Sequence, residues 1–207
     1  IKTTSSKVSS KQEYSRNSAK SSSLPDLRKY PSGTPRKKAF LRTVMPYITS
    51  QNAAITVERN WLISKQYQGQ WSPAERARLK DIAKRYKVKW SGNTRKIPWN
   101  TLLERVDIIP TSMVATMAAA ESGWGTSKLA RNNNNLFGMK CMKGRCTNAP
   151  GKVKGYSQFS SVKESVSAYV TNLNTHPAYS SFRKSRAQLR KADQEVTATA
   201  MIHKLKG

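Results

Sequence analysis

Hydrophobic positions recur at three- and four-residue steps along most of the chain after residue 38, which predicts a mainly helical protein. The pattern predicts helices over about 39–67, from Ser72 onward, over 99–106, 110–121, from Ser161 onward, over 183–190 and over 197–205. Two of these helices start with a capping box, in which a serine and a glutamate three residues later cap each other's backbone N–H groups. The boxes are Ser72-Pro73-Ala74-Glu75 and Ser161-Val162-Lys163-Glu164.

The segment 110–121 is apolar on nearly all sides, which is typical of a buried, central helix. Met113, Met117 and Glu121 fall on one stripe of it, and Ser122-Gly123 ends it. The pattern therefore places one carboxylate at the end of an apolar helix, directly before Gly123-Trp124-Gly125.

Residues 137–159 have a different pattern, in which glycines and a proline divide the chain into short pieces. This spacing is typical of turns between short strands, and we expect a small β-hairpin lobe there. The predicted fold class is α+β, mostly helical.

Residues 1–38 carry ten Lys and Arg, two acids and few apolar side chains. Such a segment buries too little apolar surface to offset its chain entropy, so we predict a disordered basic tail or linker. Residues 39–207 then form one domain. The chain starts at Ile1 and stops soon after a helical pattern, so we expect a removed signal peptide and a domain cut short at its C-terminus.

The whole chain has 38 Lys and Arg against 11 acids, a formal net charge of +27. This excess favours polyanionic partners such as nucleic acid, anionic lipid or acidic wall polymers. No apolar run reaches the roughly 18 residues that would span a bilayer. Cys141 and Cys146 are too few for a structural zinc site, and we expect no metal and no cofactor. A disulfide across this small loop, in an oxidising compartment, fits better than the alternative of two free thiols.

Glu121 and Glu164 are the only acids between Thr111 and Thr175. Apolar surroundings, the negative end of the helix dipole and a covering Trp124 would all favour the protonated form of Glu121, as a general acid requires. The alternative is an ordinary exposed glutamate near a helix end. Glu164 fits capping better than catalysis. A single acid argues against the carboxylate pair that most glycosidases use. The attacking water must then be activated by another group, or the reaction must be assisted by a group of the substrate such as its 2-acetamido oxygen.

Several aromatic residues follow the expected hairpin, and aromatic faces suit sugar rings, although most aromatics are simply core. Tyr169 lies on an apolar helical stripe and is expected in the core, whereas Tyr179 follows a helix stop and could point into a groove. His176 fits a turn better than a catalytic role. The other aromatics of this group are Tyr156 and Phe159.

Five motifs occur in order along the second half of the chain: Ala120-Glu121-Ser122-Gly123-Trp124-Gly125, Ser127-Lys128-Leu129-Ala130, Asn135-Leu136-Phe137-Gly138, Tyr156-Ser157-Gln158-Phe159 with Glu164-Ser165, and His176-Pro177-Ala178-Tyr179. This set resembles glycoside hydrolase family 73, the endo-β-N-acetylglucosaminidase-like domain of bacterial wall hydrolases, and within it the Bax-type proteins. The resemblance covers about 75–207, and 39–74 more loosely. It implies a lysozyme-like fold, with a helical lobe and a small β-hairpin lobe around a groove.

The resemblance also implies that Glu121 is the general acid and that Tyr179 belongs to the active site. Trp124, Asn135, Phe137 and Tyr156 would bind substrate. Several family members carry a second acid on the β-hairpin, but residues 138–160 contain no Asp or Glu.

The resulting hypothesis is hydrolysis of β-1,4 bonds of N-acetylglucosamine in peptidoglycan by a periplasmic or envelope-associated monomer. The basic surface would hold anionic envelope polymers, with no specific nucleic acid as partner. The alternatives are a lytic transglycosylase, which needs one acid and forms an anhydro sugar, and a non-catalytic polyanion-binding protein.

Overall fold

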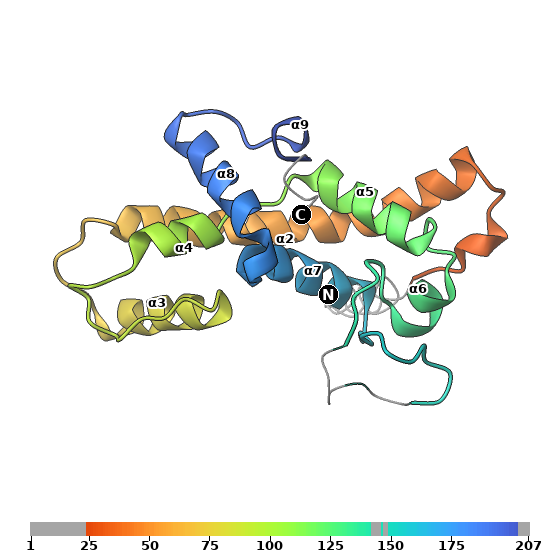
Figure 1. Cartoon of the computed structure of the whole chain (residues 1–207), viewed down its shortest axis with the longest axis horizontal. Coiled ribbons are helices and arrows are strands. Elements are labelled where there is room, and N and C mark those ends of the chain that lie inside the picture. The colour runs from red at the N-terminus through yellow and green to blue at the C-terminus, as the bar shows by residue number, and fades with distance from the viewer. Residues whose placement is uncertain (1–23, 142–145, 147–148, 203–207) are drawn as a thin grey trace, which may run out of the picture. The chain divides into compact units, whose positions relative to one another are not determined.

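The computed structural model describes residues 24–141, 146 and 149–202, and most of these residues are helical (Figure 1). The elements in chain order are η1 (Leu27–Lys29), α2 (Thr34–Lys65), α3 (Pro73–Arg85), α4 (Trp99–Arg105), α5 (Thr111–Ser122), α6 (Lys128–Asn133), α7 (Val162–Thr175), η2 (Pro177–Tyr179), α8 (Ser180–Lys191) and α9 (Ala198–Met201). The prediction of a mostly helical fold is confirmed.

The chain divides into two compact units. The first unit contains the described residues up to Val44 together with Ala118–Ser165. The second contains Met45–Met117 and the described residues from Val166 onward. We describe each unit by itself.

The second unit has an aliphatic core supplied by several helices. Its fully buried side chains include Leu62 of α2, Leu79 of α3, Leu102 of α4 and Leu173 of α7. The N-terminus of α3 carries the predicted capping box, with Ser72 accepting from the Glu75 N–H and Glu75 accepting from the Ser72 N–H. The periodic pattern found these helices because their apolar stripes are the surfaces that pack.

A buried cluster of charges completes the core of the second unit, and the sequence pattern did not reveal it. Asp107, only 1% exposed, accepts two hydrogen bonds from Arg190 at 2.9 and 2.7 Å. Arg59 and the fully buried Arg186 lie 3.4 and 3.9 Å from the same carboxylate. Arg186 also donates to the Asn174 side chain and to backbone carbonyls. Three arginines therefore surround one aspartate.

The first unit includes residues that we had assigned to the disordered tail. The part of that tail before residue 24 lies outside the described residues. Residues 24–38 are folded: η1 begins at Leu27 and α2 begins at Thr34, five residues before the predicted helix start. Leu27 is fully buried, and Arg36 donates to the carbonyls of Leu27 and Tyr30. The tail boundary at residue 38 was wrong because one buried leucine gives this basic segment an anchor.

The predicted β-hairpin does not form as two strands in the described parts of 137–159. One antiparallel bridge joins Lys140 and Tyr156. The Ser157 N–H also donates to the Met139 carbonyl, and the Cys141 N–H to that of Gly155. The segment otherwise runs as turns and irregular backbone.

Helix α5 is less buried than its composition predicts. Met113, Val114, Ala118 and Ala119 are buried, but Ser112, Thr116, Ala120 and Glu121 are exposed. A line of small and polar residues therefore faces solvent. The predicted helix over 197–205 is the short α9, and residues 203–205 lie outside the described range.

Candidate active site

The turn after α5 has a rare backbone conformation. Gly123, Trp124 and Gly125 have φ values of 55°, 56° and 79°, so three consecutive residues are left-handed. Ser122 organises this turn, because its buried hydroxyl donates to the Ala118 carbonyl and accepts from the Gly125 N–H at 2.9 Å. Glycine tolerates this conformation readily, whereas tryptophan adopts it at a cost.

The strained Trp124 is held by α2. Its indole packs edge-on against Phe40, with ring centroids 5.6 Å apart, and the Lys37 ammonium lies 5.1 Å from its ring centroid. We predicted that this ring would cover the Glu121 carboxyl. Its defined ring contacts are with α2, so Trp124 anchors the turn, while its half-buried ring keeps some solvent-facing surface.

Gly125 is required where the turn meets the N-terminal segment. A Cβ on Gly125 would lie 2.4 Å from Leu27 Cδ1 and 3.2 Å from Phe40 Cδ2. Real Cβ atoms do not approach other heavy atoms at 2.4 Å. The residues that fix the turn bearing Glu121 therefore include Leu27 and Phe40, far away in sequence.

Glu121 is exposed, and among the described residues no side chain or backbone group forms a hydrogen bond or ion pair with its carboxylate. The predicted apolar surroundings are therefore wrong. The carboxylate lies close to the backbone of Gly138: a Cβ added to Gly138, which has a φ of 64°, would lie 3.2 Å from Glu121 Oε2. The missing side chain at Gly138 lets the carboxylate lie close to the backbone of the 136–139 loop.

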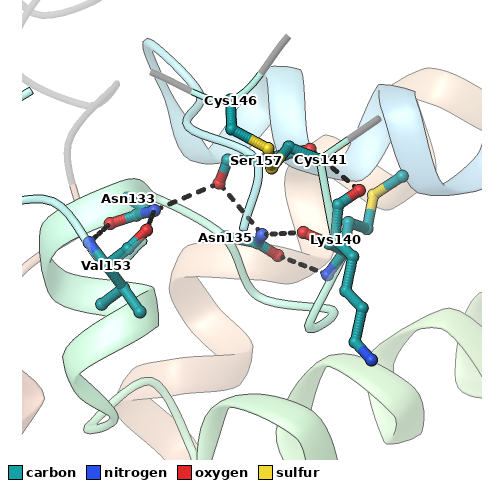
Figure 2. The surroundings of a disulfide bond; sticks show 8 residues. Asn133, Asn135, Lys140, Cys141, Cys146, Val153 and Ser157 are labelled. Atoms are coloured by element: carbon teal, nitrogen blue, oxygen red, sulfur yellow. Dashed lines mark hydrogen bonds between the residues drawn. A yellow bond between two sulfur atoms is a disulfide. The ribbon is translucent and has the colours of Figure 1, made fainter. Parts of the chain in front are cut away.

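Asn135 holds that loop in place. Its side-chain oxygen accepts from the N–H groups of Phe137 and Met139. Its Nδ2 donates to the carbonyl of Met139 and to that of Ser157, the latter shown in Figure 2. Asn135 is only 1% exposed. Both atoms of its amide are thus bonded to the loop that carries Gly138, and the predicted role of Asn135 in substrate binding stays a prediction.

The neighbouring asparagines also form hydrogen bonds to the backbone of this lobe. Buried Asn133 exchanges hydrogen bonds with both backbone groups of Val153 and also reaches the Ser157 carbonyl (Figure 2). Asn134, left-handed at a φ of 50°, donates to the Phe159 carbonyl. These amides pair with backbone groups that a hairpin would pair with each other, which explains why a single bridge suffices. The four consecutive asparagines at 132–135 were the sequence signal that could have revealed these contacts.

The predicted disulfide between Cys141 and Cys146 is present, with Cα atoms 5.4 Å apart. Cys141 directly follows Lys140, which forms the bridge with Tyr156, and Figure 2 shows the disulfide beside Lys140. The bond therefore belongs to the same small lobe as the asparagines, next to the loop that bears Gly138.

The other acids described in the first unit are engaged. Glu164 accepts from the hydroxyl and from the N–H of Ser160, the latter at 2.7 Å, while the Ser161 hydroxyl accepts from the Glu164 N–H. The two bonds from Ser160 lower the pKa of Glu164. The predicted capping role is present, with the contact shifted by one residue from Ser161 to Ser160. Asp26 is paired with Arg28 at 2.9 Å.

The aromatic residues predicted to bind substrate have different environments. Phe137 is buried, so it supports the loop from inside and does not offer an open face. Tyr156 is half-buried and takes part in the single bridge. Tyr169 is buried in the second unit, as predicted for a core residue.

Tyr179 lies in the second unit and is half-buried. Its ring packs edge-on against His176, with centroids 6.2 Å apart. His176 Nδ1 accepts from the Ala178 N–H and caps η2, which fits the predicted turn role. The structure thus brings Glu121, Trp124, Asn135, Phe137 and Tyr156 into one unit and places Tyr179 in the other.

Neither a metal cluster nor a membrane span is found in the described ranges. No three His, Cys, Asp or Glu side chains gather there as metal ligands would. None of the described helices combines the length and hydropathy that crossing a bilayer requires.

A family model for glucosaminidases, described as mannosyl-glycoprotein endo-beta-N-acetylglucosaminidase, matches residues 98–204, just over half of the chain. The chain therefore belongs to this family of glycoside hydrolases. The match includes Glu121, Gly138 and the asparagines, whereas Leu27 and Phe40 lie before it. No solved structure matches the chain.

Proposed function

We propose that the chain hydrolyses the β-1,4 bond of N-acetylglucosamine in bacterial peptidoglycan, with Glu121 as general acid. The observation that carries the proposal is the state of the three acids described in the first unit. Asp26 is paired with Arg28, Glu164 is bound by Ser160, and Glu121 alone is exposed without a partner. It stands at the end of α5, on a turn and beside a loop that are both held in place from several sides.

The reaction begins with transfer of the Glu121 proton to the glycosidic oxygen. The bond from that oxygen to C1 breaks, and its electron pair stays on the leaving oxygen. Because residues 138–160 contain no acid, the positive charge at C1 is met by the 2-acetamido oxygen of the same sugar. Water then adds to C1 and returns a proton to the Glu121 carboxylate.

Other residues have supporting roles in this proposal. Trp124 and Tyr156, both half-buried, contribute aromatic surface to a groove of the lysozyme-like kind. Tyr179 orients the acetamido group or the water. The disulfide supports an oxidising location such as the periplasm, and the basic surface holds the enzyme, as a monomer, on anionic envelope polymers.

Product analysis tests the reaction type. Purified sacculi are digested with the full chain, and the soluble fragments are analysed by mass spectrometry before and after borohydride reduction. The proposal predicts fragments that end in reducing N-acetylglucosamine. Anhydro ends would instead show a lytic transglycosylase, and absence of soluble fragments together with tight polyanion binding would show a non-catalytic protein.

A further inference from the structure

Three tryptophans of the second unit form an aromatic cluster outside its core. Trp61 of α2 and Trp71, which follows α2, have ring centroids 6.2 Å apart, and Trp71 and Trp99 of α4 have centroids 6.3 Å apart. All three rings are half-buried, whereas Leu62 and Leu102 beside them in sequence are fully buried. The tryptophan cluster (Trp61, Trp71 and Trp99) therefore keeps indole surface in contact with water, next to a core that is already filled.

A cation without a carboxylate partner among the described residues lies on this cluster. The Arg78 guanidinium of α3 is 4.5 Å from the centroid of the Trp61 ring, and Arg78 is exposed. In the described part of the chain no carboxylate forms an ion pair with Arg78. A planar guanidinium can bind a carboxylate through two parallel hydrogen bonds. Arg78 is thus positioned by the indole and available to an anion.

The support beneath the cluster is already ordered. Glu75 forms an ion pair with Lys65 at 2.5 Å and accepts from the Gln68 amide at 3.0 Å. The Trp71 Nε1–H donates to the Gln68 carbonyl. These contacts fix the α2–α3 connection, so a ligand would bind with little cost for ordering the protein.

The charge of this region favours an anionic ligand. Residues 61–99 hold ten Lys and Arg and only two acids, Glu75 and Asp81. Both acids are paired, Glu75 with Lys65 and Asp81 with Arg85. The surplus positive charge attracts polyanions over a distance and leaves Arg78 as a specific contact.

We propose that the tryptophan cluster and Arg78 form a second glycan-binding surface, which holds a polysaccharide that carries carboxylates. Sugar rings would pack on the indole faces, and a carboxylate of the polymer would pair with Arg78. The choice of a glycan rests on the proposed function. Single-stranded nucleic acid also uses aromatic and cationic groups, and it is the competing ligand in the test.

The test measures cosedimentation of the full chain with insoluble sacculi, in a Glu121→Gln background so that the polymer is not digested. Arg78→Gln and Trp61→Ala are each expected to weaken sacculus binding by about tenfold, the effect of losing one charged hydrogen-bonded contact or one aromatic contact. Amidation of the sacculus carboxylates should weaken binding of the parent chain more than binding of Arg78→Gln, because both lose the general charge attraction and only the parent loses the contact at Arg78.

Two matched controls separate this surface from general charge and general packing. Arg76→Gln removes the same charge from the exposed side of α3. Trp90→Ala removes a half-buried tryptophan outside the cluster. Both controls should bind sacculi like the parent. Thermal melting of every variant shows whether it is folded, and Trp61→Phe, which keeps an aromatic ring, should lose less binding than Trp61→Ala.

The proposal is overturned if folded Arg78→Gln and Trp61→Ala bind sacculi like the parent, or if Arg76→Gln loses as much binding as Arg78→Gln. It is also overturned if the parent prefers a single-stranded oligonucleotide over sacculi and the two cluster variants lose only that binding. Hydrolysis of a soluble glycan fragment, measured with Glu121 restored, should stay within about twofold for both cluster variants, because they leave chemistry unchanged. Absence of hydrolysis by the parent chain, together with sacculus binding that still depends on Arg78 and Trp61, would instead contradict the proposed function alone.

Discussion

At the scale of single residues, Glu121 lies beside Gly138, a position that has no side chain. Gly138→Ala would put a Cβ 3.2 Å from Glu121 Oε2, at a φ of 64°. We expect the carboxylate to be displaced and hydrolysis to fall by about tenfold or more, because small displacements of catalytic groups have large effects on rate. Initial rates of sacculus solubilisation measure this loss.

Gly151→Ala is the matched control for that substitution. Gly151 has a φ of 77°, so an alanine there carries similar backbone strain, of about 1 kcal/mol, but meets nothing within 4 Å. Both variants should therefore lose similar stability, and only Gly138→Ala should lose activity. Equal activities in the two variants would show that the approach to Glu121 has no catalytic importance.

The sequence indicated the catalytic candidate but not its surroundings. Glu121 was identifiable because it ends an apolar helix in a chain with few acids. The exposure of Glu121 could not be predicted, because the solvent side of α5 carries small residues whose type does not distinguish them from core residues. The family resemblance implied that Asn135 binds substrate, and the sequence alone does not distinguish an amide that binds a ligand from one that binds the backbone.

At the scale of elements, the segment 24–44 is an integral part of the first unit. Leu27 is fully buried against Gly125. Leu27→Ala should reduce the free energy of unfolding by about 2–5 kcal/mol, measured by urea denaturation, because it removes buried methyl groups and leaves a cavity. Leu41→Ala, at an exposed position of α2, is the control and should cost much less.

The contact between Gly125 and Leu27 can be tested by a double-mutant cycle. Gly125→Ala alone should be strongly destabilising, because its Cβ would overlap Leu27 Cδ1. In a Leu27→Ala background the same change should cost less, since the overlapping atoms are gone. Additive effects would contradict the packing described for the turn.

Elements with a regular apolar stripe were predictable, and those fixed by polar side chains were not. The start of α3 followed from the Ser72 capping box. The lobe over 137–159 was predicted as a hairpin because glycines and turns are typical of one. Its backbone groups bond largely to the side chains of Asn133 and Asn135. The alternation of polar and apolar residues along the sequence does not reveal such contacts.

At the scale of the whole molecule, the largest group of buried charged side chains in the described residues is the Asp107 cluster. Asp107→Asn would leave Arg186 and Arg59 without their carboxylate, and we expect a loss of about 3–5 kcal/mol in the free energy of unfolding. Asp81→Asn, which breaks an exposed pair with Arg85, should cost about 0.5 kcal/mol or less.

The same cluster predicts a pH dependence of stability. Burial alone would raise the pKa of Asp107, but the hydrogen bonds from Arg190 and the charges of Arg186 and Arg59 outweigh it and lower that pKa below the ordinary aspartate value. The stabilisation is therefore complete above the ordinary aspartate pKa and is lost as the pH falls through the lower folded value. Urea denaturation between neutral pH and pH 3 should show this acid loss in the parent and a smaller one in Asp107→Asn.

The central claim is that Glu121 supplies the proton, and the comparison of Glu121→Gln with Glu164→Gln tests it most directly. Both changes remove one exposed carboxylate of the first unit, and both variants should fold, as thermal melting will show. Initial rates on purified sacculi should fall by about 10²–10⁴-fold for Glu121→Gln and stay near the parent rate for Glu164→Gln. A Glu121→Gln variant with near-parent rates, or an equal loss in both variants, would contradict the account.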